Sequence, residues 1–177
     1  VGSEMCIRDR YSLLSGKDRP SRNVGKDKGG SVMNELIPKP VKILKVKDQT
    51  PIEKLFTLGV KLGQKPGQFI EMSIAGVGEA PVSICSSPTR GNVEVCVRRV
   101  GRVTNALHRL GAGARVGVRG PYGNGFPLEK MRGSEVVLVA GGIGMAPVRA
   151  VLQYLLDKKK EYGEIKLLYG IRDYSMM

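Results

Sequence analysis

Gly141-Gly142-Ile143-Gly144-Met145-Ala146-Pro147 is the stretch that decides the fold of this 177-residue chain. It follows an apolar run, residues 136–140, and it opens a pattern with helical periodicity. Glycines let a backbone turn tightly and approach a ligand closely, and a helix start offers unpaired N–H groups to an anion. The pattern predicts a strand, a turn and a helix, in which the turn is either a phosphate site or a plain connection.

The residues after this turn predict a helix and a second strand. Pro147 suits the first helical turn, where its missing N–H costs nothing, and residues 158–160 place three lysines in the last turn. Gly163 is the predicted stop, and residues 165–169 form a second apolar run. Strand, helix and strand make a βαβ unit with parallel strands. The apolar face of the helix is predicted to consist of Val148, Val151, Leu152, Leu155 and Leu156.

The middle of the chain has an all-β pattern with one helical insert, residues 104–110. Short runs recur about every ten residues, with turn residues such as Lys65-Pro66-Gly67 between them. The predicted fold class is a six-stranded, antiparallel, Greek-key β-barrel followed by the start of an α/β nucleotide-binding domain, one βαβ unit. The predicted strands cover residues 41–47, 53–60, 68–73, 81–86, 93–100 and 114–119.

The sequence predicts three segments along the chain. Residues 1–32 are rich in Gly, Ser, Lys, Arg and Asp, and we expect a disordered, non-native leader, because Val1–Arg10 resembles a translated sequencing adapter. Met33 is the better candidate for the true start. Residues 33–125 form the predicted barrel domain, and residues 126–177 the N-terminal part of the α/β domain. Because one βαβ unit cannot bury both faces of a parallel sheet, we expect a C-terminally truncated fragment.

Composition narrows the classes of function. The net charge of +13 suits an acidic or phosphorylated partner, but no run of basic residues is long enough for a nucleic-acid tail. No apolar stretch is long enough to span a bilayer, and no secretory signal pattern is present. The three cysteines fit neither a metal motif nor a disulfide framework, so we expect no metal ligands and a cytoplasmic location.

Over roughly residues 36–173 the chain resembles the ferredoxin–NADP reductase superfamily. It looks most similar to electron-transfer subunits: the gamma subunit of cytoplasmic nickel–iron hydrogenase (sulfhydrogenase), the flavin subunit of anaerobic sulfite reductase, and the electron-transfer subunit of dihydroorotate dehydrogenase. Six segments in the family's order carry the resemblance: residues 65–69, 81–84, 101–104, 119–123, 141–147 and 169–172.

The resemblance implies a function and a set of cofactors. We expect FAD as the bound cofactor, NAD or NADP as substrate, and a [2Fe–2S] cluster only in the missing C-terminal part. The implied activity is flavin-dependent electron transfer between NAD(P)H and an iron–sulfur or catalytic partner subunit of the hydrogenase, sulfite reductase or dihydroorotate dehydrogenase type. Neither nucleic acid nor a membrane is an expected partner, and the fragment alone is expected to be inactive.

The resemblance also assigns roles to residues. Ser83 is the expected catalytic residue, with its hydroxyl near flavin N5, although a serine satisfied within a β-ladder would look the same. Thr104 either contacts the flavin pyrophosphate or caps a helix, and both roles can hold together. His108 is expected to be structural, and Cys85 and Cys96 to be small buried hydrophobic residues. The expected cofactor-binding residues are Pro81, Val82, Ser83, Ile84, Arg98, Val100, Gly101, Val103, Thr104, Gly141, Gly142, Gly144, Met145, Ala146, Pro147, Gly170 and Arg172.

Two residues depart from the family's Arg-x-Tyr-Ser motif. Ala80 replaces the arginine that holds a flavin phosphate, and Val82 replaces the tyrosine that packs on the flavin ring. One alternative is therefore a structural subunit that has lost flavin. Another is a basic, OB-like nucleic-acid-binding barrel, which predicts exposed aromatic platforms; the chain has no Trp and three Phe.

Overall fold

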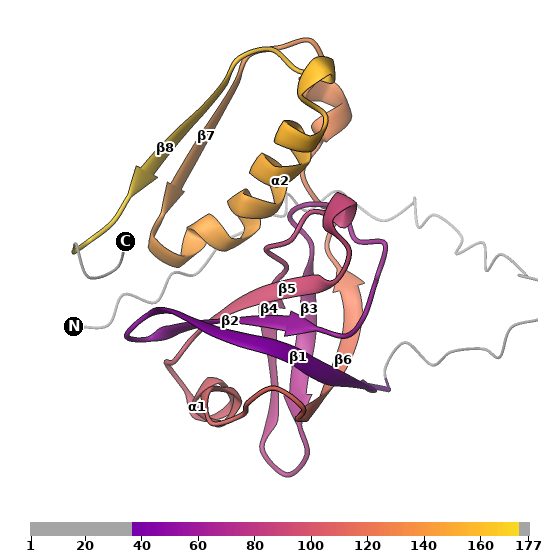
Figure 1. Ribbon diagram of the computed structural model, residues 1–177, viewed down its shortest axis with the longest axis vertical. Helices are drawn as coiled ribbons and strands as arrows, with labels where there is room; N and C mark the ends of the chain where they lie inside the picture. Colours follow the sequence, from indigo (N-terminus) through magenta and orange to yellow (C-terminus); the bar gives the residue numbers. More distant parts are fainter. Residues whose placement is uncertain (1–36, 174–177) are drawn as a thin grey trace, which may run out of the picture. The chain divides into compact units, whose positions relative to one another are not determined.

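The computed structural model describes residues 37–173 (Figure 1). The predictions for the leader, residues 1–32, and for a start at Met33 lie outside the described residues. Within the described range, no helix is long and apolar enough to cross a membrane.

Six antiparallel strands build the first part of the fold, and they confirm the predicted barrel. Their order in the sheet is β4-β3-β6-β1-β2-β5, so chain neighbours are often not sheet neighbours, as in Greek-key barrels. An isolated antiparallel bridge between Ile84 and Val95 brings the ends of the order together. The strands are β1 (Lys39–Thr50), β2 (Glu53–Leu58), β3 (Phe69–Ile74), β4 (Gly78–Ser83), β5 (Val93–Arg98) and β6 (Arg115–Tyr122).

Alternation along the strands separates the barrel core from its outer face. In β5, Val93, Val95 and Val97 are buried, whereas the residues between them face outward. The outer face of β5 contributes to one wall of the candidate site described below. The buried core consists of Val41, Ile43, Phe56, Leu58, Ile70, Met72, Val82, Ile84, Val93, Val95, Val97, Leu107, Val116 and Val118.

Strand β1 is longer than the predicted 41–47 because it pairs with two partners. Residues 39–42 pair with β6, and residues 43–50 pair with β2, with register shifts near Ile43 and Asp48. The polar ends of the strand carry no apolar alternation, so the sequence pattern alone underestimates its length.

Strand β4 was predicted at 81–86, but it runs from Gly78 to Ser83. The reason is a tight hairpin with β3, in which Gly76 and Gly78 adopt positive φ angles that favour glycine. After Ser83 the chain leaves β3, and Ile84 turns to β5 instead.

Helix α1 (Arg102–His108) begins two residues before the predicted 104–110. Gly101 is the N-cap residue, so Thr104 is the third helical residue and not the cap. The Thr104 hydroxyl reaches back and accepts hydrogen bonds from the N–H groups of Val100 and Gly101, at 3.0 and 2.9 Å.

The predicted βαβ unit is confirmed, with β7 (Val136–Gly141) parallel to β8 (Ile165–Gly170). Between them lie a 3₁₀ turn, Gly142–Gly144, and helix α2 (Met145–Asp157), which covers one face of the strand pair (Figure 1). Their apolar core consists of Leu128, Val136, Leu138, Val151, Leu155 and Tyr162. The remaining short 3₁₀ helices are Pro88–Arg90, Leu128–Met131 and Lys159–Glu161.

Three details of α2 differ from the prediction. Leu156 is 50% exposed and does not belong to the buried face. Residues 158–160 follow the last helical turn, because α2 ends at Asp157. Gly163 is required by close packing and not as a helix stop, since a Cβ there would lie 2.9 Å from the carbonyl oxygen of Ser134.

Candidate functional site

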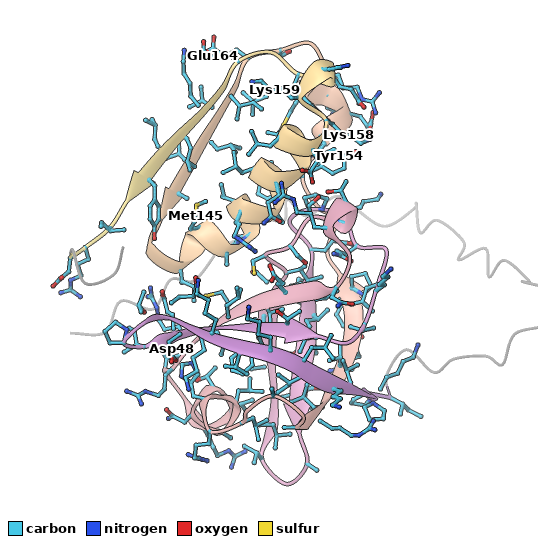
Figure 2. All side chains as sticks on the ribbon, in the orientation of Figure 1. Asp48, Met145, Tyr154, Lys158, Lys159 and Glu164 are labelled. Carbon is cyan, nitrogen blue, oxygen red and sulfur yellow. The ribbon has the colours of Figure 1, made fainter. Side chains whose placement is uncertain are left out.

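A cavity of about 180 Å³ lies where the glycine turn meets the outer face of the barrel. Met145, at the start of α2, lines it from one side (Figure 2). Residues of β1, β2 and β5 line it from the other. Its walls are formed by Gln49, Thr50, Glu53, Leu55, Cys85, Cys96, Gly142, Met145, Ala146, Arg149 and Tyr169.

The glycine turn brings bare backbone to this cavity. Gly142 has a φ of +49°, and a Cβ at this position would lie 3.4 Å from the Arg98 guanidinium, so a larger residue is strained there. A Cβ at Gly144 would meet no atom within 4 Å. The Tyr169 hydroxyl donates a hydrogen bond to the Gly142 carbonyl at 3.3 Å and ties the end of β8 to the turn. An exposed turn followed at once by a helix start fits an anionic nucleotide.

A partly buried ion pair lies beside the turn. Both the Nε and Nη2 atoms of Arg98 donate to Glu53 Oε1, at 2.9 and 2.6 Å, and Glu53 is buried. The Thr50 hydroxyl donates to the second carboxylate oxygen at 3.3 Å. Arg98 was expected to neutralise a flavin phosphate, but in the structure its charge is already balanced by Glu53.

Two thiols line the same cavity. Burial raises the pKa of Cys85 to about 12 and that of Cys96 to about 11. Both are therefore protonated at neutral pH and are poor nucleophiles or metal ligands. Cys85 is fully buried as expected, whereas Cys96 is only partly buried. Within residues 37–173, no group of His, Cys, Asp and Glu side chains is arranged to hold a metal ion.

The predicted flavin segment of β4 presents one free polar side chain. Ser83 is partly exposed, and its hydroxyl has no hydrogen-bond partner among residues 37–173. The side chains of Val82 and Ile84 pack in the barrel core, so only their backbone remains for a ligand. Pro81 is exposed. An unpaired, accessible hydroxyl between core residues is compatible with a ligand along this strand.

In the predicted pyrophosphate segment, some backbone N–H groups already form hydrogen bonds within the segment. Val100 and Gly101 are exposed, but both of their N–H groups already bond to the Thr104 hydroxyl. Val103 packs against the barrel core. Thr104 therefore has a structural role at the start of α1. His108, also expected to be structural, bonds the Val97 carbonyl through Nε2 at 2.7 Å.

The structure gathers only some of the predicted residues at the cavity. Gly142, Met145 and Ala146 line it, and Arg98 lies next to Gly142. The sequence analysis missed Glu53 and Arg149, which have no local signal because long-range pairing brings them there. Tyr169 lies in a segment that carries the family resemblance, but it was not predicted as a site residue. The predicted residues that do not line the cavity are Pro81, Val82, Ser83, Ile84, Arg98, Val100, Gly101, Val103, Thr104, Gly141, Gly144, Pro147, Gly170 and Arg172.

Comparison with known families decides what this arrangement is. The model for the oxidoreductase FAD-binding domain matches residues 35–126, which is more than half of the chain. The chain belongs to this FAD-binding oxidoreductase family. A second model, for the oxidoreductase NAD-binding domain, matches residues 138–177. The family thus accounts for the barrel, and the second match for the glycine turn and the βαβ unit.

Curated relatives of this family member include hydrogenase and dihydroorotate dehydrogenase subunits. The gamma subunit of sulfhydrogenase 2 from Pyrococcus furiosus is 47% identical over 150 residues, covering 81% of this chain and 52% of the relative. A probable dihydroorotate dehydrogenase B (NAD(+)) electron transfer subunit from the same organism is 40% identical, covering 67% of this chain and 43% of the relative. The chain therefore spans about half the length of the curated relatives it matches.

A solved structure supports the fold. Ferredoxin-NADP+ reductase from Plasmodium falciparum matches with a TM-score of 0.69 at 17% identity, over 79% of this chain and 61% of that one. At this identity the likeness concerns the fold alone. The relatives in turn confirm the predicted likeness to sulfhydrogenase gamma and dihydroorotate dehydrogenase electron transfer subunits.

Proposed function

We propose that the protein is an NAD(P)H-dependent flavin oxidoreductase subunit that transfers electrons between NAD(P)H and an iron–sulfur partner subunit. The observation that carries this proposal is the single cavity shared by the glycine turn and the outer face of the FAD-domain barrel. In this proposal the cavity is where the nucleotide turn faces the barrel, and the flavin lies along the β4 and α1 segments of that barrel. The names of the relatives, a sulfhydrogenase gamma subunit and an electron transfer subunit, support the same role.

We assign the flavin to the barrel, residues 33–125, and the nucleotide to residues 126–177, the beginning of the NAD(P)-binding domain. Bound FAD supplies the redox chemistry, which is exchange of a hydride with a nicotinamide and of single electrons with a partner. The chain itself contributes orientation. The Ser83 hydroxyl is free to hydrogen-bond the flavin near N5, and the backbone of Pro81, Val82 and Ile84 lines the same strand.

The remaining flavin contacts are proposed at the start of α1. Val100, Gly101 and Val103 bring backbone close to the pyrophosphate, and Thr104 keeps that loop in shape through its two accepted hydrogen bonds. Arg98 remains paired with Glu53 in this proposal. Since this pair leaves little net positive charge, we assign Arg98 a role in shaping the wall between flavin and nucleotide.

The glycine turn and α2 hold the nicotinamide nucleotide in this proposal. Bare backbone at Gly141, Gly142 and Gly144 admits the pyrophosphate, and the first turn of α2 supplies the positive end of the helix dipole. Met145, Ala146 and Pro147 form that first turn. Gly170 ends β8 beside Gly141, and Arg172 follows two residues later.

The partner is proposed as a catalytic or iron–sulfur subunit of the hydrogenase, sulfite reductase or dihydroorotate dehydrogenase type. A [2Fe–2S] cluster belongs, in this proposal, to the complete electron-transfer subunit. We place the protein in the cytoplasm, where thiols such as Cys85 and Cys96 stay reduced.

A structural subunit without flavin is the second candidate. Ala80 offers no charge to a flavin phosphate, and the Val82 side chain is turned into the barrel core. Nucleic-acid binding is not favoured, because the family match accounts for the barrel and the glycine turn together.

A visible absorption spectrum of the purified full-length protein tests the proposal, followed by anaerobic addition of NADH or NADPH. Flavin bands that bleach on addition would support it, and the faster reductant identifies the nucleotide. Gly142→Ala should retain the flavin but slow its reduction, because the positive φ and the nearby Arg98 oppose a Cβ. Gly111→Ala is the matched control, since a Cβ there meets no atom within 4 Å. A colourless protein would favour the structural-subunit alternative.

A further inference from the structure

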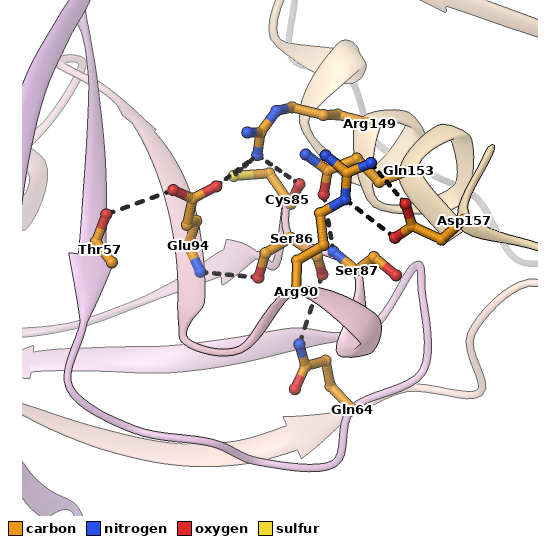
Figure 3. Close-up of polar contacts among 10 residues, drawn as sticks. All are labelled: Thr57, Gln64, Cys85, Ser86, Ser87, Arg90, Glu94, Arg149, Gln153 and Asp157. Atoms are coloured by element: carbon orange, nitrogen blue, oxygen red, sulfur yellow. Dashed lines mark hydrogen bonds and ion pairs between the residues drawn. The ribbon is translucent and has the colours of Figure 1, made fainter. Parts of the chain in front are cut away.

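The barrel and the βαβ unit have separate apolar cores. Every member of the first core lies within residues 41–118, and every buried member of the second lies within residues 128–162. The two cores do not merge, so a shared apolar core does not fix the position of the glycine turn on the barrel. Several hydrogen bonds and ion pairs join α2 to the barrel (Figure 3).

One face of α2 makes these contacts. Arg149, Gln153 and Asp157 recur every four residues and so lie on one side of the helix, spread over about 12 Å. Ala146 and Ala150 share this side, and they are buried although they belong to neither apolar core. Their small side chains let the helix approach closely. This docking face, defined by these five residues, is distinct from the apolar face of α2.

The end of the docking face near the cavity is anchored by Arg149. Its Nη1 donates to the Cys85 carbonyl and to Glu94 Oε2, both at 2.8 Å. The other oxygen of Glu94 accepts a hydrogen bond from the Thr57 hydroxyl at 3.4 Å, which holds the carboxylate from β2. One turn further along, Gln153 Oε1 accepts the backbone N–H of Ser87 at 3.0 Å, so that a buried loop residue is satisfied by the helix.

The far end is anchored by Asp157. Arg90 donates to both carboxylate oxygens, from Nε at 3.0 Å and from Nη2 at 2.7 Å, and the Thr89 hydroxyl donates at 2.5 Å. A bidentate pair fixes direction as well as distance. The bonds from Arg90 and Thr89 hold the pKa of Asp157 down, at about 2, so the carboxylate stays charged.

We propose that the docking face is a positioning device, in which anchors at both ends of α2 fix the helix direction and thereby hold the glycine turn over the barrel wall. This inference rests on the proposed function, because it gives the positioned turn its purpose. One anchor alone would let the helix pivot about a point. Two anchors separated by two helical turns prevent this, and a small displacement between reacting groups is costly in rate, up to about 100-fold for 1 Å.

The Arg90–Asp157 pair is the informative target. Arg149 lines the cavity, so its replacement would mix positioning with direct contact. Arg90 and Asp157 do not line the cavity, and neither belongs to an apolar core. The variants are Arg90→Glu, Asp157→Lys and the double exchange, prepared in the full-length protein. Glu135→Lys is the matched control, because it breaks an exposed pair with Lys166 inside the βαβ unit by the same change of charge.

Two measurements follow. Hydrogen exchange on the full-length proteins should show faster exchange in residues 85–90 for both single variants, because a released helix end moves Gln153 away from the Ser87 N–H that it accepts from. Anaerobic stopped-flow mixing with NADH or NADPH should show the limiting rate of flavin reduction falling by about 10-fold or more, with nucleotide Kd and flavin content within about twofold. The double exchange should restore both readouts in part, because the exchanged Glu–Lys pair recovers the attraction but not the bidentate geometry, and Glu135→Lys should alter neither.

The outcomes are separable. Unchanged exchange and unchanged limiting rates in both single variants would overturn the positioning role. The same holds if Kd rises while the limiting rate stays, since that indicates a binding effect. If the wild-type protein holds flavin that neither nucleotide reduces, the proposed function fails, and the exchange data alone then decide whether the anchors hold the helix.

Discussion

At the scale of single residues, the site depends on side chains whose partners are far away in the sequence. Glu53 and Arg98 form their pair only because β2 and β5 are adjacent, and 45 residues separate them along the chain. The sequence predicted Gly142 and Met145 from a local pattern of glycines before a helix. Glu53 and Arg149 have no such pattern, and only strand pairing and helix docking bring them to the cavity.

Substitutions of Thr104 test its structural role in the absence of a ligand. Thr104→Val removes the hydroxyl that accepts from Val100 and Gly101, and the flavin-free protein should lose about 1 kcal/mol of unfolding free energy. Thr104→Ser keeps the acceptor and should stay within about 0.5 kcal/mol of the wild type. Denaturant unfolding measures both. Equal stability of the two variants would show that the capping bonds contribute nothing.

The two cavity thiols should be unreactive. Because burial raises the pKa of Cys96 to about 11, its alkylation by iodoacetamide at pH 7.5 should be about 100-fold slower, or more, than that of an ordinary cysteine. Cys85, with a pKa of about 12, should be slower still. Peptide mapping by mass spectrometry gives the rate at each cysteine. The denatured protein is the control, in which both should react at ordinary rates; fast labelling in the folded state would contradict the burial.

At the scale of elements, periodicity predicted most of the fold. The alternation in β5 and the apolar face of α2 gave the correct element types, because each buries one side against its own core. The bounds of β4 were wrong, since the hairpin turn at Gly76 and Gly78 is set by positive φ angles rather than by apolar spacing. The length of β1 could not be predicted from the sequence pattern, because it depends on pairing with both β2 and β6.

Adjacent leucines of α2 provide a matched test of its buried face. Leu155 is fully buried in the core of the βαβ unit, whereas Leu156 is 50% exposed. Leu155→Ala should cost about 2–5 kcal/mol of unfolding free energy, because it leaves a cavity. Leu156→Ala should cost about 0.5 kcal/mol or less. Denaturant unfolding measures the free energy of unfolding of both variants. Similar losses of unfolding free energy would mean that the helix is rotated from the position described.

At the scale of the whole molecule, the junction of barrel and βαβ unit should respond to acid. Because the pKa of Asp157 is lowered from 3.8 to about 2 by Arg90 and Thr89, its stabilising contribution is complete above pH 4 to 5 and is lost as the pH falls towards 2. The stability gap between wild type and Asp157→Asn should therefore be constant from pH 7 to about 5 and close between about 4 and 2. Denaturant unfolding across this range measures it; a gap that persists at pH 2 would assign the effect to something other than charge.

Two family models match two different regions of the chain, and the structure shows the contacts between these regions. The barrel carries the match to the FAD-binding domain, and the βαβ unit carries the match to the NAD-binding domain. The sequence predicted both regions, because each has its own periodic pattern. It could not predict the polar contacts between them, which are made by residues that look like ordinary surface positions on a helix and a loop.

The separate apolar cores also bear on how such a protein can be recombined. A junction of hydrogen bonds and ion pairs demands agreement at few positions, whereas a shared apolar seam demands matched shapes along its whole length. A chimera that joins this barrel to the βαβ unit of a relative therefore has to preserve Arg90 and Glu94 on one side and three polar positions of α2 on the other. Because the two cores are separate, we expect the barrel and the βαβ unit to be exchangeable among members of this family without rebuilding either interior.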